Sequence, residues 1–222
     1  MQVYGHRGAG AGAGENSLAS IRAALDAGAG GVEVDARRTR DRRVVLSHEP
    51  HVGGHPLIHT PYAELEPLAG ALLSDALDLA RGRGRVIIEV KNQAWEPDFD
   101  SPDEATVAAV VDLLVPEDDV VISSFDFYAA EAARDAGLRS AFVSMPGVRP
   151  VAAVAYAQEA GLDEAHIWVG DVLGELRCVQ TAADAGVRLV VWTVTTPEQL
   201  ETLADAGVPA VIADYLPARI TA

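Results

Sequence analysis

The stretch Arg85-Val86-Ile87-Ile88-Glu89-Val90-Lys91 (RVIIEVK, residues 85–91) determines the fold that we predict for this chain. Its apolar residues are β-branched and follow one another almost without interruption, which is typical of a strand buried on both faces. Strands of that kind occur in parallel sheets, where helices cover both faces of the sheet. We therefore predict that residues 85–91 form one strand of a parallel sheet.

Seven further segments have the same character. They are QVYG (2–5), GGVEVDA (30–36), DVVISS (119–124), SAFVS (140–144), HIWVG (166–170), RLVVWTV (188–194) and AVIAD (210–214). Alanine-rich segments with helical period separate most of them, and several end in Ala-Gly, a typical helix stop. Eight such units in 222 residues predict a (β/α)8 TIM barrel, with a short last helix in YLPARITA (215–222). The alternative is an open doubly wound sheet, which seldom needs eight equal repeats.

One region departs from the alternation of strands and helices. After the second strand, a turn at 40–42 precedes a further predicted strand, VVLSH (44–48). Residues 49–73 are rich in His, Pro and Gly and show no clear period. We expect them to form a short insertion or lid above the barrel, within a single TIM-barrel domain that spans residues 1–222.

The composition excludes several classes of function. A formal net charge of −16 argues against a nucleic-acid-coating protein or a basic membrane-surface module, because both need a dominant positive field. Cys178 is the only cysteine, so neither an internal disulfide nor a cysteine-based zinc cluster can form. The sequence shows no signal-like segment and no apolar run long enough to span a membrane. We expect a cytoplasmic protein with a small-molecule substrate, no nucleic-acid partner and no stable membrane association.

Polar residues collect at the carboxyl ends of the predicted strands, where the loops of a parallel barrel form its mouth. They are His6, Arg7, Glu33, Asp35, His48, Glu89, Lys91, Trp192 and Asp214. His166 opens the sixth predicted strand, so we expect it at the opposite, amino-terminal end of the barrel.

Three of these residues are carboxylates. Glu33 and Asp35 are two positions apart in one strand, so their side chains point to the same side. Glu89, at the end of another strand, would add a third oxygen donor. Like charges in a semi-enclosed site need a cation or a shared proton, and oxygen donors suit a hard ion such as Mg²⁺ or Ca²⁺. The alternative is that a lone Glu-x-Asp is merely a solvated strand end.

Lys91 is the only lysine in the chain, which otherwise obtains positive charge from arginine. A salt bridge to Glu89 is one explanation, but arginine would serve for that. A lysine offers a compact point charge that suits a single phosphoryl oxygen beside a metal ion, and the planar fork of Arg7 could hold other oxygens of the same group. His6 and His48 fit a general acid and a general base, although a single strand-end histidine is more often structural.

The ordered set of short motifs resembles the glycerophosphodiester phosphodiesterase family over nearly the whole chain, from His6 to Pro217. The motifs are His6-Arg7-Gly8, Glu15-Asn16-Ser17, Gly31-x-Glu33-x-Asp35, Thr39-x-Asp41, His48, Glu89-x-Lys91, Trp192-Thr193 and Asp214-x-x-Pro217. The resemblance implies the same (β/α)8 barrel and one bound divalent cation. It also implies roles: Glu33, Asp35 and Glu89 as metal ligands, His6 and His48 as acid and base, Arg7 and Lys91 as phosphate contacts, and Trp192 as an aromatic wall near the glycerol or the leaving group.

Some positions differ from the usual family pattern. The common Pro-Glu-Asn-Thr is Gly14-Glu15-Asn16-Ser17, the usual His-Asp is His48-Glu49, and the asparagine expected after Trp-Thr-Val is Thr195. The insertion at 49–73 is also shortened, in the region where contacts to the leaving group are expected. These differences therefore bear on which alcohol the site accepts.

The resemblance implies a metal-dependent hydrolase that converts glycerophosphodiesters to glycerol 3-phosphate and an alcohol, and so a role in lipid and glycerol metabolism. Either Mg²⁺ or Ca²⁺ satisfies the donors. The nucleophile is either water or the glycerol 2-hydroxyl, which gives a cyclic phosphate. The alternatives are a lysophospholipid phospholipase D that uses the same site and a non-catalytic barrel that binds a phosphate ligand.

Overall fold

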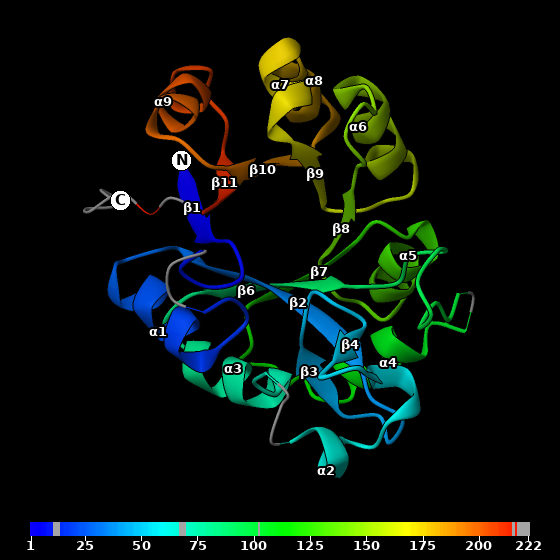
Figure 1. Cartoon of the computed structure of the whole chain (residues 1–222). Coiled ribbons are helices and arrows are strands. Elements are labelled where there is room, and N and C mark those ends of the chain that lie inside the picture. Colours follow the sequence, from blue (N-terminus) through cyan, green and yellow to red (C-terminus); the bar gives the residue numbers. More distant parts are fainter. Residues whose placement is uncertain (11–13, 67–69, 102, 215, 217–222) are drawn as a thin grey trace.

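The computed structural model describes residues 1–10, 14–66, 70–101, 103–214 and 216. Eight parallel strands form a closed barrel with helices around it (Figure 1). In order round the barrel they are β1 (Gln2–Gly5), β2 (Gly31–Arg38), β6 (Arg85–Val90), β7 (Val120–Ser124), β8 (Ser140–Val143), β9 (Glu164–Trp168), β10 (Arg188–Val194) and β11 (Ala210–Ala213). Because β1 pairs with both β11 and β2, the sheet closes. The predicted TIM barrel is confirmed.

Helices connect the strands, and some of them begin or end at residues that favour such boundaries. The connecting helices are α1 (Leu18–Asp26), α3 (Leu73–Ala80), α4 (Ala105–Val111), α5 (Phe127–Asp135), α6 (Pro150–Glu159), α7 (Val169–Gly174), α8 (Cys178–Ala185) and α9 (Pro197–Asp205). The side chains of Ser17, Asp126 and Thr196 accept a backbone hydrogen bond at the start of α1, α5 and α9. Gly186 ends α8 in the left-handed conformation, with φ 70°.

The apolar residues form two layers. Those that face outward from the strands pack against the helices, as Ile21 of α1 does beside Val32 and Val34 of β2. Those that face inward fill the barrel itself, and Tyr4, Ile87 and Ile212 belong to that inner group. Burial of each such side chain contributes about 1.5–3 kcal/mol. The filled interior leaves the mouth at the carboxyl ends of the strands as the place for a site.

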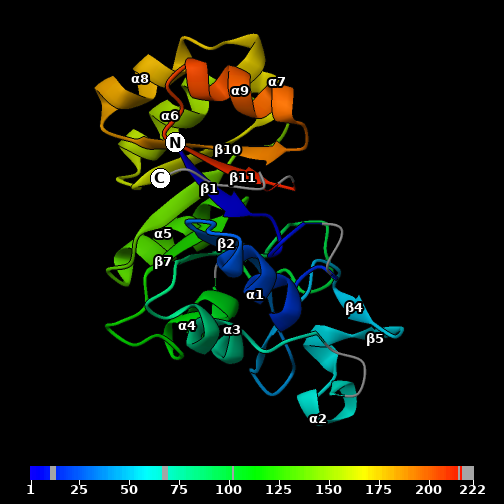
Figure 2. The same ribbon diagram turned by 90° about the vertical axis from the view of Figure 1, so that its left-hand side faces the viewer.

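The segment after β2 contains more regular structure than its sequence indicated. β3 (Val44–Leu46) pairs antiparallel with β2. A small hairpin of β4 (His51–Val52) and β5 (His55–Pro56), the 3₁₀ turn η1 (Leu57–His59) and the helix α2 (Tyr62–Leu65) follow it. Val45, Leu57 and Leu65 form a small core of their own. Figure 2 shows β4, β5 and α2 at the edge of the molecule, and the lid function of 49–73 stays a prediction.

The sixth barrel strand corrects one expectation. It starts at Glu164, so His166 lies in the middle of β9, is 1% exposed and does not open the strand at the amino-terminal end of the barrel. The acidic Glu164 is nevertheless buried, because His166 Nε2 lies 3.0 Å and Arg85 Nη1 3.4 Å from its carboxylate oxygens. The last helix predicted in 215–222 falls, except for Leu216, outside the described residues.

No helix in the described part of the chain is both long and apolar enough to cross a membrane.

Candidate active site

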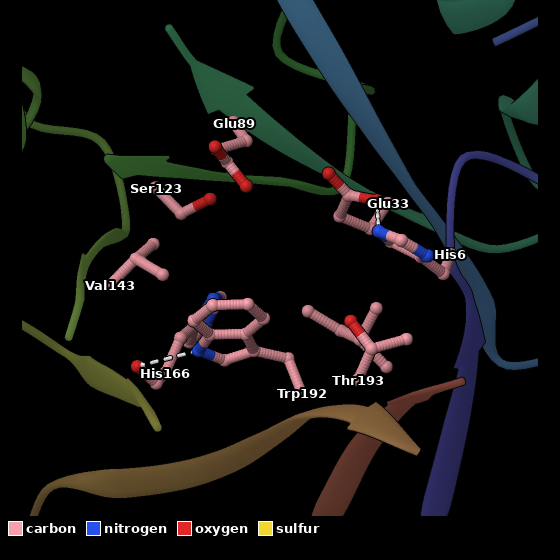
Figure 3. A pocket seen from close by; sticks show the side chains of 9 residues that line it. His6, Glu33, Glu89, Ser123, Val143, His166, Trp192 and Thr193 are labelled. Carbon is pink, nitrogen blue, oxygen red and sulfur yellow. Dashed lines mark hydrogen bonds and ion pairs between the residues drawn. The ribbon is translucent and has the colours of Figure 1, made fainter. Parts of the chain in front are cut away.

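Three carboxylates meet at the mouth of the barrel. The parallel register of β2 and β6 places Asp35 opposite Glu89, and Glu33 lies one pleat earlier on the same side of β2. One oxygen atom from each of Glu33, Asp35 and Glu89 lies within 4.8 Å of the others. Figure 3 shows Glu33 and Glu89, which come from two neighbouring strands, directed into the same space.

The two carboxylates on β2 lie in opposite electrostatic surroundings. Glu33 is 2% exposed, and burial together with repulsion from Asp35 and Glu89 raises its pKa well above the usual range. Burial acts in the same direction on Asp35, but the positive charges of Lys91 and Arg7 outweigh it and hold the pKa of Asp35 below its usual value. Negative charge at Glu33 is therefore the least compensated in the cluster.

This cluster fits a hard divalent cation. All three donors are carboxylate oxygens, which Mg²⁺ and Ca²⁺ prefer. The Oε1 atom of Glu33 is buried and accepts no hydrogen bond from the described residues. A buried ionised oxygen without a partner is costly, and a cation would offset that cost. The residues present thus match the ion that the sequence led us to expect.

Metal binding should be measurable as thermal stabilisation. Adding Mg²⁺ or Ca²⁺ to chelator-treated protein should raise the melting temperature, since a ligand present at 100 times its Kd adds about 2.7 kcal/mol to the free energy of unfolding. The Glu33→Gln variant should be at least as stable as the parent in EDTA, because it lacks a buried like charge, and should lose most of the gain from metal. Differential scanning fluorimetry measures both. If metal raised the melting temperature of the variant as much as that of the parent, Glu33 would be excluded as a metal ligand.

Two cations compensate the cluster in part. Lys91, directly after β6, places Nζ 2.7 Å from Asp35 Oδ1 and also pairs with Glu89. Arg7 places Nε 3.1 Å from Asp35 Oδ2, and its backbone N–H donates a 3.0 Å hydrogen bond to Glu33. The salt bridge that was one explanation for Lys91 is therefore present. It also holds the ammonium group beside the candidate metal ligands.

Both histidines are oriented by a carboxylate. The Nδ1 atom of His6 lies 2.7 Å from Asp214 Oδ1, and its Nε2 atom lies 3.9 Å from Glu33 Oε2. The Nδ1 atom of His48 lies 2.8 Å from Glu49 Oε1. A carboxylate at Nδ1 favours the tautomer that carries its proton there, so Nε2 is the nitrogen left to exchange a proton at the site.

The loop after β1 holds His6 in place by close backbone packing. Gly8 has φ 98°, and a Cβ atom there would lie 2.1 Å from Ser20 Oγ. The hydroxyl of Ser20 accepts a 2.7 Å hydrogen bond from the backbone of Ala9 and donates one of 3.0 Å to the carbonyl of Arg7. Only glycine fits this turn, which explains the Gly8 of the His-Arg-Gly motif.

The structure brings the predicted site residues to two connected cavities. The outer cavity, at the mouth, has a volume of about 240 Å³. It is lined by His6, Arg7, His48, Glu89, Lys91, Gln93, Trp95, Phe125, Met145, Pro146 and Trp192. The inner cavity has a volume of about 20 Å³, and His6, Glu33, Glu89, His166 and Trp192 are among its lining residues (Figure 3). Asp35 is not among the lining residues of either cavity, but it contacts Lys91 and Arg7, which line the outer one.

Three residues at the site carried no predicted role. Asp214 was noted only as a strand-end residue. Asn16 donates a 2.8 Å hydrogen bond from Nδ2 to Asp35 Oδ2, and its Oδ1 accepts one of 3.0 Å from the Asp35 backbone. Arg37, 1% exposed, donates from Nε to the His48 carbonyl at 2.9 Å. Asn16 belongs to the Glu-Asn-Ser motif, and Arg37 lies two positions after Asp35; these were the only signals in the sequence.

The chain is similar to known proteins over almost its whole length. The model of the glycerophosphoryl diester phosphodiesterase family matches residues 6–217. A glycerophosphodiester phosphodiesterase of Caldanaerobacter subterraneus is 25% identical over 96% of this chain and 93% of that protein. The uncharacterised protein YqiK of Bacillus subtilis is 24% identical over 96% of this chain and 95% of that protein.

Solved structures share the fold. A phosphodiesterase of Oleispira antarctica, in complex with the product sn-glycerol-3-phosphate, superposes with a TM-score of 0.82 at 23% identity, over 97% of this chain and 93% of that chain. A glycerophosphodiester phosphodiesterase of Thermotoga maritima gives 0.80 at 21% identity, over 96% and 94%. Because the family match extends over nearly the whole sequence, the chain belongs to the glycerophosphoryl diester phosphodiesterase family, a family of phosphoric diester hydrolases.

Proposed function

We propose that this protein is a metal-dependent phosphodiesterase that hydrolyses glycerophosphodiesters to glycerol 3-phosphate and an alcohol such as ethanolamine or choline. One observation carries the proposal: three clustered carboxylates, one lysine and two carboxylate-oriented histidines border the same mouth. The product bound to the Oleispira antarctica phosphodiesterase supports glycerol 3-phosphate as the product here. We also propose that the enzyme acts in the cytoplasm, in lipid and glycerol metabolism.

In this proposal Glu33, Asp35 and Glu89 hold one divalent cation, Mg²⁺ or Ca²⁺. Such an ion supplies positive charge to the phosphoryl oxygens during the reaction. Lys91 and Arg7 bind other oxygens of the same group, and Lys91 adds charge stabilisation as charge develops on the phosphate. Trp192, which packs edge-to-face on Phe125 with ring centroids 5.4 Å apart, forms an apolar wall beside them.

The histidines move the protons. One accepts a proton at Nε2 from the nucleophile, which is water or the glycerol 2-hydroxyl. The other donates a proton from Nε2 to the oxygen of the leaving alcohol as its bond to phosphorus breaks. Because each Nδ1 is held by a carboxylate, His6 and His48 are equally suited to either task. If the glycerol hydroxyl attacks, water then opens the cyclic phosphate by the same two transfers in reverse order.

The proposal is tested by an assay of purified protein against glycerophosphocholine, glycerophosphoethanolamine and glycerophosphoinositol. We expect release of glycerol 3-phosphate in Mg²⁺ or Ca²⁺ and its loss in EDTA, with recovery when the ion is added in excess. An enzyme-coupled glycerol 3-phosphate measurement gives the rate. Protein that binds the metal but hydrolyses none of these diesters would instead favour the non-catalytic phosphate-binding barrel.

A further inference from the structure

An apolar cavity of about 230 Å³ lies next to the mouth of the barrel. Aromatic side chains from two segments form most of its lining. Trp95 and Phe99 come from the loop after β6, and Phe125, Phe127 and Tyr128 come from the end of β7 and the start of α5. We call the cavity that these five aromatic residues line, together with Met145 after β8, the aromatic cavity.

The side chains of the aromatic cavity are unusually exposed for their kind. Trp95 is 68%, Tyr128 60% and Phe127 48% exposed. Among the described residues ten large hydrophobic side chains are exposed, and five of them lie here. Single exposed apolar residues are ordinary, but a contiguous group of them marks a binding surface.

The aromatic cavity continues from the candidate active site. Gln93, Trp95, Phe125 and Met145 line both it and the outer cavity that contains His48 and Lys91. A substrate with its phosphate beside Lys91 can therefore extend one of its two ester groups along Trp95 and Phe125. The inner cavity, at about 20 Å³, has no room for such a group.

Buried polar contacts fix the loop that carries Trp95 and Phe99. Arg37 Nη1 donates to both oxygens of Asp98, at 2.8 and 2.7 Å, and its Nη2 donates to Glu96 at 2.6 Å. The same guanidinium binds the carbonyl of His48 through Nη2 at 2.7 Å. One buried cation thus ties the aromatic loop to the backbone of a predicted acid/base residue.

The other side of the loop is tied to α5. Asn92 Nδ2 donates a 2.8 Å hydrogen bond to Asp126, and Asn92 Oδ1 accepts one of 2.9 Å from the backbone of Asp100. Asp126 in turn accepts from the backbone of Tyr128 at 3.1 Å. Both oxygens of the one carboxylate in the lining are therefore engaged, which leaves the aromatic faces as the surface that a ligand meets.

We propose that the aromatic cavity is the subsite for the leaving alcohol and that it binds an uncharged hydrocarbon chain on that alcohol. This rests on the proposed function and specifies its substrate class: glycerophosphodiesters whose second ester group is apolar and extended. A glycerophosphoalkyl ester meets that description, whereas the head groups ethanolamine and choline leave most of the cavity unfilled.

The test is a series of glycerophosphoalkyl esters with ethyl, butyl, hexyl and octyl groups. Burial of each methylene favours binding, so kcat/KM should rise about two- to fourfold per methylene until the cavity is full. The ratio of kcat/KM for the hexyl and ethyl esters should fall at least about fivefold in Tyr128→Ala and in Phe99→Ala. It should be unchanged in the matched control Leu113→Ala, an exposed apolar residue before β7 at the other end of the barrel.

The outcomes are separable. If no ester and no natural glycerophosphodiester is hydrolysed, the proposed function fails; if the short esters react but the series is flat, only the aromatic subsite fails. A tenfold preference for the choline ester over its uncharged 3,3-dimethylbutyl isostere would show that the aromatic cavity binds a cationic group, and would overturn the proposal that it binds an uncharged hydrocarbon chain. A flat series with binding to phosphatidylcholine vesicles that Tyr128→Ala abolishes would mark a membrane-docking surface and overturn the proposal as well.

Discussion

Replacing His6 by alanine should lower kcat by about 10²–10⁴, the usual contribution of a general acid or base. The side chain is small and partly exposed, and its loss removes one hydrogen bond to Asp214, so the fold should be kept. His48→Ala should cost a similar factor, because its imidazole lies on the same outer cavity and has the same carboxylate support at Nδ1. Steady-state rates at saturating metal measure both effects.

The matched control is His55→Ala, which removes an exposed histidine of β5 that lines neither cavity. It should keep the parent rate. Asp214→Asn retains His6 but replaces the carboxylate at Nδ1, so we expect a smaller loss than that of His6→Ala. Near-full turnover in His6→Ala or in His48→Ala would exclude that histidine from the reaction. Circular dichroism would show whether a loss of activity reflects misfolding.

Lys91→Met should lower kcat/KM by about 10²–10³, as is usual when one group that stabilises developing charge is removed. The variant loses the ammonium that lies 2.7 Å from Asp35 Oδ1, so the carboxylate cluster also becomes more negative. Measurement over a range of metal concentrations separates the two consequences. If the variant needed a lower metal concentration than the parent and then reached the parent rate, the only role of Lys91 would be to offset the negative charge of the carboxylates.

Lys91→Arg distinguishes charge from shape. A guanidinium keeps the positive charge but presents a planar fork in place of a compact ammonium, so we expect it to recover only part of the rate. Full recovery would show that the single lysine of this chain has no property that arginine lacks here. Arg42→Met, at an exposed ion pair 3.6 Å long with Asp112, serves as the control for loss of a positive charge.

The barrel and the carboxylate cluster could be predicted from local patterns. A run of β-branched residues shows where a buried strand lies, and the alternation of side chains along a strand places Glu33 and Asp35 on one side. Both rules involve only neighbours in the sequence. The same rules place Glu89 on an equivalent strand end, and the register of β2 and β6 agrees.

Other contacts depend on residues far apart in the chain. The pair His6–Asp214 spans 208 positions and Arg37–Asp98 spans 61. Arg37 belongs to the run Ala-Arg-Arg-Thr-Arg, which looks like a solvated surface, and only the folded loop with Asp98 and Glu96 explains its burial. The sixth strand was misplaced for the same reason: Glu164 resembles a turn residue until its partners His166 and Arg85 are known.

The pairing of β1 with β11 has a consequence for the order in which the enzyme matures. His6 directly follows the first strand, whereas Asp214, which accepts its hydrogen bond, follows the last. During synthesis the chain emerges from its amino terminus at about 5–20 residues per second. The clustered carboxylates Glu33, Asp35 and Glu89 and the ammonium of Lys91 are therefore made long before the partner of His6. Nascent chains arrested before β11 should lack turnover, so activity marks completion of the barrel and not merely presence of its reactive groups.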